Sequence, residues 1–194
     1  MLRLFRDRGG ASAAEFALVL PLLLLLLFGI IDAGRYMWTI NRAEKAAQMG
    51  VRMAVVTDYV SDAIGENYVG QCATPLTAGD NIPAACFTQI TCSRTGNNAT
   101  CTDGAADTAA FNVVLSRIQA FMPEVEASNV QIIYSPSGLG YAGDPNGPDV
   151  APLVTVRLSG MTFTPIVFLA FASVALPEAR SSLTFEDGQG TESN

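Results

Sequence analysis

A long apolar run stands near the start of the chain. Residues 11–31 contain a single ionisable side chain, Glu15, among apolar and small residues. A helix needs about 20 predominantly apolar residues to cross the hydrocarbon core of a bilayer. The pattern therefore predicts a transmembrane helix over residues 11–31.

Helical periodicity continues beyond this run. Residues 32–56 contain no proline, and small or apolar residues recur at steps of three and four, which is the spacing of one helix face. We expect one helix from about residue 11 to about residue 56, with residues 32–57 as a helical extension of the span. Small residues let helices approach closely, so this face packs either on the chain's own domain or on neighbouring subunits. Its members are Ala33, Tyr36, Ile40, Ala43, Ala47, Gly50 and Ala54.

From residue 58 onward, short apolar segments alternate with turn-forming residues. A helix capped by Asp107 or Thr108 is expected to end at Pro123. Alternating or β-branched segments at residues 87–91, 130–134, 153–158 and 181–185 predict strands, with a turn at 95–98 and a long flexible loop at 135–149. The predicted fold class is α+β: residues 58–194 form a domain with a second helix and a small antiparallel sheet of three or four strands.

A second apolar run covers residues 161–176 and contains Pro165. Its 16 residues fall below the length of about 18 that indicates a transmembrane helix. We expect a buried helix or an irregular core segment here rather than a second span, and the pattern leaves membrane association open.

All four cysteines lie in a loop-rich region at residues 72–101. Outside the cytoplasm such a group is typical of disulfides, and four cysteines allow three pairings that the sequence does not separate. Zinc is the alternative, but the spacing has no C-x2-C pair and the chain has no histidine. We therefore predict no metal and no cofactor. The cysteines are Cys72, Cys86, Cys92 and Cys101.

Charge separates the first ten residues from the rest. Residues 1–10 carry three arginines and one aspartate, whereas the whole chain has a net charge of −7. A basic flank keeps a terminus in the cytoplasm, so residues 1–10 are expected to be a cytoplasmic leader and the rest to lie outside. A secretory signal is the competing interpretation, but its apolar region is about 7–15 residues long and ends at a small-residue cleavage site.

The acidic exterior argues against binding to nucleic acid. The absence of histidine removes the commonest general base, and no catalytic motif is present, so we do not expect an enzyme. A membrane-anchored hydrolase that uses carboxylates or a serine–lysine pair is the alternative from the enzyme class, because such groups meet in space rather than in sequence.

The start of the apolar run carries a specific motif. Gly10 is followed by Ala11, three further small residues, Glu15 and Phe16, which resembles the processing site of type IV prepilins. The wider context to about residue 55 is similar to the TadE-like family of minor pilins, or pseudopilins, of tight-adherence (Flp-type) pilus systems. The resemblance implies that a membrane peptidase cuts between Gly10 and Ala11 and leaves Glu15 at the fifth mature position.

The same resemblance implies a function and a location. The chain would be a minor pilin with a single span in the bacterial inner membrane, its N-terminus cytoplasmic and its domain periplasmic. Its partners would be the prepilin peptidase, other pilin subunits and the inner-membrane pilus platform, with assembly through Glu15 and the small-residue face. A membrane-anchored scaffold that does not enter the filament is the alternative.

Overall fold

The computed structural model describes residues 11–145, 147–166 and 173–185, and the chain divides into two compact units. Met1–Thr39 and Thr162–Ala175 form the first, here called the helical unit. Ile40–Met161 and Leu176–Asn194 form the second, here called the sheet unit. Each unit is described by itself.

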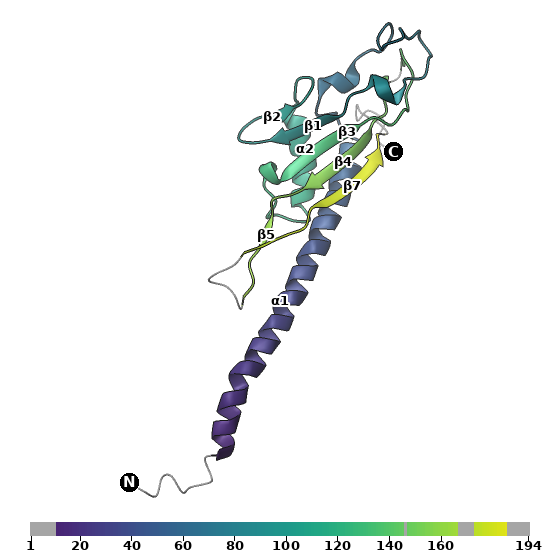
Figure 1. Cartoon of the computed structure of the whole chain (residues 1–194). Coiled ribbons are helices and arrows are strands. Elements are labelled where there is room, and N and C mark those ends of the chain that lie inside the picture. The colour runs from purple at the N-terminus through teal and green to yellow at the C-terminus, as the bar shows by residue number, and fades with distance from the viewer. Residues whose placement is uncertain (1–10, 146, 167–172, 186–194) are drawn as a thin grey trace, which may run out of the picture. The chain divides into compact units, whose positions relative to one another are not determined.

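One long helix, α1 (Ala11–Ala54), supplies most of the helical unit and continues into the sheet unit (Figure 1). The prediction of a single helix is confirmed, and its C-terminal end lies two residues before the predicted one. Pro21 lies inside α1 without interrupting it, as membrane helices tolerate.

The helical unit also contains a short hairpin. Strand β5 (Thr162–Phe163) pairs antiparallel with β6 (Val174–Ala175). Of the two alternatives predicted for residues 161–176, a buried helix or an irregular core segment, the helix is absent from the described part of that run. Pro165 disfavours a helix, and the aromatic and β-branched residues on either side favour extended backbone. Residues 167–172 lie outside the described residues.

The sheet unit is built on five antiparallel strands in the order β2-β1-β3-β4-β7, so the α+β class is confirmed with more strands than predicted. The predicted strand at 87–91 is shifted: the 3-10 helix η4 (Ala84–Cys86) comes before it, and strand pairing begins at Ile90. The turn at 95–98 closes the β1–β2 hairpin, as predicted. The strands are β1 (Ile90–Arg94), β2 (Ala99–Cys101), β3 (Val130–Ser135), β4 (Leu153–Leu158) and β7 (Ala179–Thr184).

Helices cover one face of this sheet (Figure 1). Helix α2 (Thr108–Gln119) is capped by Asp107, whose carboxylate accepts from two backbone N–H groups at 2.7 and 3.1 Å. It ends at Gln119, four residues before the Pro123 that was predicted to end it. Gly50 of α1 lies against Ile118 of α2 and Val156 of β4, and a Cβ at Gly50 would be 2.7 Å from Ile118 Cγ1.

The segment predicted to be a long flexible loop, 135–149, is organised around one buried carboxylate. Asp149 accepts hydrogen bonds from the backbone N–H groups of Tyr68, Gly143 and Asp144 at 2.6, 2.8 and 2.9 Å. Gly140 forms a β-bridge with Val150. Asp149 is therefore a structural acceptor that shapes the turn, and the described residues hold no group of metal ligands.

Candidate functional site

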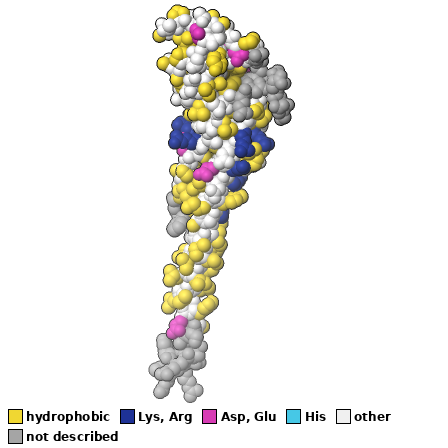
Figure 2. All heavy atoms as spheres, turned by 90° about the vertical axis from the view of Figure 1, so that its right-hand side faces the viewer, with side chains coloured by type: hydrophobic (Ala, Val, Ile, Leu, Met, Phe, Trp, Pro, Cys, Tyr) yellow, Lys and Arg dark blue, Asp and Glu magenta, His cyan; other side chains and the backbone are white. Residues whose placement is uncertain are grey.

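The N-terminal half of α1 exposes an apolar surface. By length and composition α1 is the one helix of the described chain that could cross a membrane. Its large apolar side chains from Phe16 to Ile31 are exposed except for the half-buried Leu20, with Leu18 at 81%, and hydrophobic side chains gather over this part of the helix (Figure 2). A monomer in water rarely exposes so large an apolar surface, so this surface requires lipid or other apolar partners.

Glu15, which was assigned to both processing and assembly, lies near the start of this surface. Gly10 is outside the described residues, and α1 begins at Ala11. Glu15 and Phe16 both lie on α1 with exposed side chains. No described residue forms a salt bridge with Glu15.

The structure separates the predicted small-residue face into two parts. Four members, Ala43, Ala47, Gly50 and Ala54, are buried inside the sheet unit. These four residues are covered by this chain's own sheet unit, which is one of the two alternatives considered for the face. Ala33 is exposed, and Tyr36 and Ile40 are half-buried.

A polar and aromatic cluster marks the end of the apolar surface. Asp32 is buried and accepts from Arg35 Nη1 at 3.0 Å and from the backbone N–H of Ile166 at 2.8 Å. The Phe163 ring lies 5.2 Å from the Arg35 guanidinium carbon and 5.5 Å from the Tyr36 ring centroid. Sequence reasoning missed this cluster, although a lone aspartate directly after an apolar run was a signal for it.

The cysteines lie in two pairs at disulfide distance. Cys72 pairs with Cys86, and Cys92 pairs with Cys101 across the β1–β2 hairpin. This selects one of the three possible pairings. Each cysteine sulfur faces one other cysteine sulfur, and no three possible metal ligands lie together among the residues that the structure describes.

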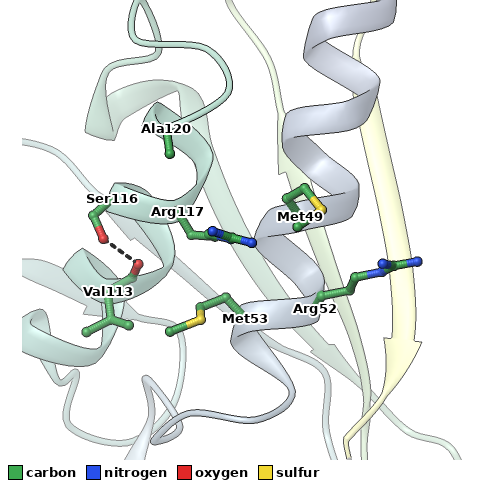
Figure 3. Close-up of a pocket in the computed structure, with 7 residues that line it drawn as sticks. All are labelled: Met49, Arg52, Met53, Val113, Ser116, Arg117 and Ala120. Atoms are coloured by element: carbon green, nitrogen blue, oxygen red, sulfur yellow. Dashed lines mark hydrogen bonds between the residues drawn. The ribbon is translucent and has the colours of Figure 1, made fainter.

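A groove of about 490 Å³ lies between α1 and α2 in the sheet unit. Figure 3 shows the Arg117 guanidinium pointing from α2 toward α1, with Met49 and Met53 beside it. The Ser116 hydroxyl donates to the Val113 carbonyl at 2.8 Å, and the chain's single lysine is not in the lining. The groove therefore does not assemble the serine–lysine pair of the hydrolase alternative. Its lining is Met49, Arg52, Met53, Val113, Ser116, Arg117 and Ala120.

Comparison with known protein families gives a match over the N-terminal helix. The family model described as TadE-like protein matches residues 10–52. The match begins at Gly10 and covers the apolar surface and most of α1, which confirms the family resemblance over this segment. No curated protein and no solved structure matches the chain.

Proposed function

We propose that this protein is a minor pilin, or pseudopilin, of a tight-adherence pilus system, anchored in the bacterial inner membrane by the N-terminal half of α1. The observation that carries the proposal is the exposed apolar helix that follows Gly10 and bears Glu15, within the segment that matches the TadE-like family. The family match supports an association with the pilus system. The specific role as a minor pilin is what we add to it.

The topology follows from charge and length. Residues 1–10 carry three arginines, and basic residues favour the cytoplasmic side. The anchor would cross the membrane once and place the sheet unit in the periplasm. There the two cysteine pairs would be oxidised and would stabilise loops that have little apolar core.

Processing would change the charge around Glu15. Cleavage between Gly10 and Ala11 removes three arginines and creates an α-amino group that is largely cationic at neutral pH. That amine lies about one helical turn from Glu15. In an apolar lateral assembly, a Glu15 carboxylate opposite a neighbour's amine offsets the desolvation of both ions and sets the axial register.

Glu15→Gln tests the proposal with Glu44→Gln as its matched control. Both glutamates are exposed on α1, but Glu44 lies in the sheet unit. At equal protein level, we expect Glu15→Gln and Glu15→Ala to abolish co-purification with other pilin subunits. Glu15→Asp should restore part of it, and Glu44→Gln should be unchanged. Normal association in Glu15→Gln would show that the carboxylate is a tolerated interfacial residue.

The mature N-terminus tests processing separately. N-terminal sequencing should find Ala11 in cells with the prepilin peptidase and the uncut leader in cells without it. An uncut leader in both strains, or cleavage beyond residue 31, would refute the pilin assignment. Recovery of the protein in sheared filaments would separate the minor pilin from a scaffold that remains in the inner membrane.

A further inference from the structure

The β5–β6 hairpin of the helical unit has the composition of a membrane-contacting element. No charged residue occurs between Met161 and Leu176. Of the described residues in that run, Ile166 and Val174 have 44% and 43% of their surface exposed. These two side chains lie one on each arm of the hairpin, and the described part of the chain does not cover them.

The contacts of the hairpin with α1 define its direction. Phe163 contacts Arg35 and Tyr36, whereas Ile166, three residues later, binds Asp32 through its backbone N–H. The first arm therefore runs toward the N-terminus of α1 by about one helical turn, or about 5 Å. In the proposed topology this direction is toward the bilayer.

The position of Asp32 along α1 places these contacts at the membrane surface. The apolar residues 11–31 extend about 31 Å as a helix, which matches a hydrocarbon core of about 30 Å. Asp32 follows directly, and Tyr36 and the exposed Trp38 come next. Tyrosine and tryptophan are enriched where a membrane helix leaves the hydrocarbon.

We propose that the β5–β6 hairpin is a second membrane contact, which inserts Ile166 and Val174 at the boundary between headgroups and acyl chains of the outer leaflet. The inference rests on the proposed anchoring of α1. An open hairpin edge cannot lie in the hydrocarbon core, where its backbone groups would lack partners, so the boundary is the depth that fits. Asp32 satisfies the Ile166 N–H there, and Arg35 neutralises the carboxylate.

Tryptophan fluorescence in lipid vesicles tests the depth of the hairpin. The chain has one tryptophan, Trp38. Trp38→Phe therefore removes the native tryptophan fluorescence, so that a single introduced tryptophan can be followed in each variant. Full-length protein with Ile166→Trp or Val174→Trp would be reconstituted at high dilution into phosphatidylethanolamine–phosphatidylglycerol vesicles. The quenchers would be acyl chains spin-labelled near the headgroup or near the bilayer centre, and aqueous acrylamide. Circular dichroism would confirm that each variant is folded.

Two reporters serve as matched controls. Phe28→Trp lies on the apolar part of α1, and Leu139→Trp replaces an exposed residue of the sheet unit. If Phe28→Trp is not quenched from the acyl chains, the anchoring itself fails. Leu139→Trp should be quenched by acrylamide alone.

The proposal expects blue-shifted Ile166→Trp and Val174→Trp emission, with the strongest loss of intensity from the shallow acyl label. Adding Asp32→Ala should reduce this quenching and leave that of Phe28→Trp unchanged. Quenching of the hairpin reporters by acrylamide alone, while Phe28→Trp is quenched by lipid, would overturn the proposal. Protection that appears only at high protein density would assign the hairpin to contact with another subunit and would also overturn it.

Discussion

The two halves of α1 share one secondary structure but have opposite surroundings. The N-terminal half is rich in leucine and exposes nearly all of those side chains, whereas the part in the sheet unit, residues 40–54, buries its four alanines and its one glycine. Burial therefore does not follow the hydrophobicity of the helix. It follows the presence of a partner layer: the sheet and α2 cover the small residues, and the described chain supplies nothing that covers the leucines.

This difference implies that the two halves are stabilised by different environments. Packing within the chain holds the sheet unit, so mutations there should change its unfolding in detergent. Lipid and partner subunits would cover the N-terminal half, so mutations there should change insertion or assembly instead. The following predictions test this separation.

The largest effect is expected from the two cysteine pairs, both in the sheet unit. Reduction, or replacement of each pair by alanine, should cost about 2–4 kcal/mol per bridge, because the crosslinks restrict the unfolded chain. Thermal unfolding by circular dichroism with and without reductant measures the loss, and membrane insertion should be unaffected. Intact mass after alkylation counts the thiols, and four free thiols in native protein would refute oxidation.

Two glycines of α1 provide the next comparison. A side chain at Gly50 would collide with Ile118 and Val156, whereas Gly34 has open space around it. Gly50→Leu should destabilise the sheet unit by about 3 kcal/mol through overpacking. Gly34→Leu should leave it unchanged or slightly more stable, because leucine is the better helix former. Equal melting temperatures for the two variants would contradict the burial of this part of α1.

Tyr134 should make the sheet unit sensitive to alkali. It is fully buried and its hydroxyl accepts from the Val60 N–H at 3.1 Å. Burial raises the pKa of Tyr134 from 10.0 to about 12. Since the folded state has the higher pKa, the stability is fully present below about pH 10 and is lost as the pH rises toward 12. The loss by pH 12 should be about 2 kcal/mol.

Tyr134→Phe isolates this contribution. It should cost about 1–3 kcal/mol at neutral pH, because the buried Val60 N–H loses its acceptor. The alkaline decline between pH 10 and 12 should become shallower in melts of the variant. Tyr141→Phe, at an exposed tyrosine of the same unit, is the control and should behave like the unmutated protein.

The smallest effect is expected at Arg42. Its guanidinium binds both carboxylate oxygens of Glu124 at 3.1 and 3.0 Å, but the glutamate is largely exposed. Arg42→Ala should therefore cost only about 0.5–1 kcal/mol. Arg52→Ala removes a cation that has no salt bridge in the described chain, and its melting temperature should not change.

The same pair predicts a weak acid dependence. The backbone N–H of Glu124, followed by Arg42, holds the pKa of the Glu124 carboxyl below its usual value. A lowered pKa in the folded state means that this stabilisation is present at neutral pH and is lost as the pH falls through the acid range. Melts of Arg42→Ala and of the unmutated protein should therefore converge at low pH.

Local patterns in the sequence determined much of this protein. The apolar run and its uninterrupted helical continuation predicted α1, the capping residues Asp107 and Thr108 predicted the start of α2, and residues 153–158 predicted β4 with its observed bounds. The motif around Gly10 and Glu15 identified the TadE-like resemblance. Helix periodicity, capping and strand alternation each depend on residues that are close together in the sequence. These features can therefore be predicted from the sequence alone.

Only the tertiary structure decided which surfaces meet. Whether Ala43 and Gly50 face the chain's own sheet or another subunit depends on a layer far away in sequence, and periodicity is the same in both cases. The pairing of four cysteines and the role of Asp149 likewise depend on contacts between distant segments. The same reason explains the hairpin: Asp32 and Ile166 are 134 residues apart, and no local pattern records that they touch.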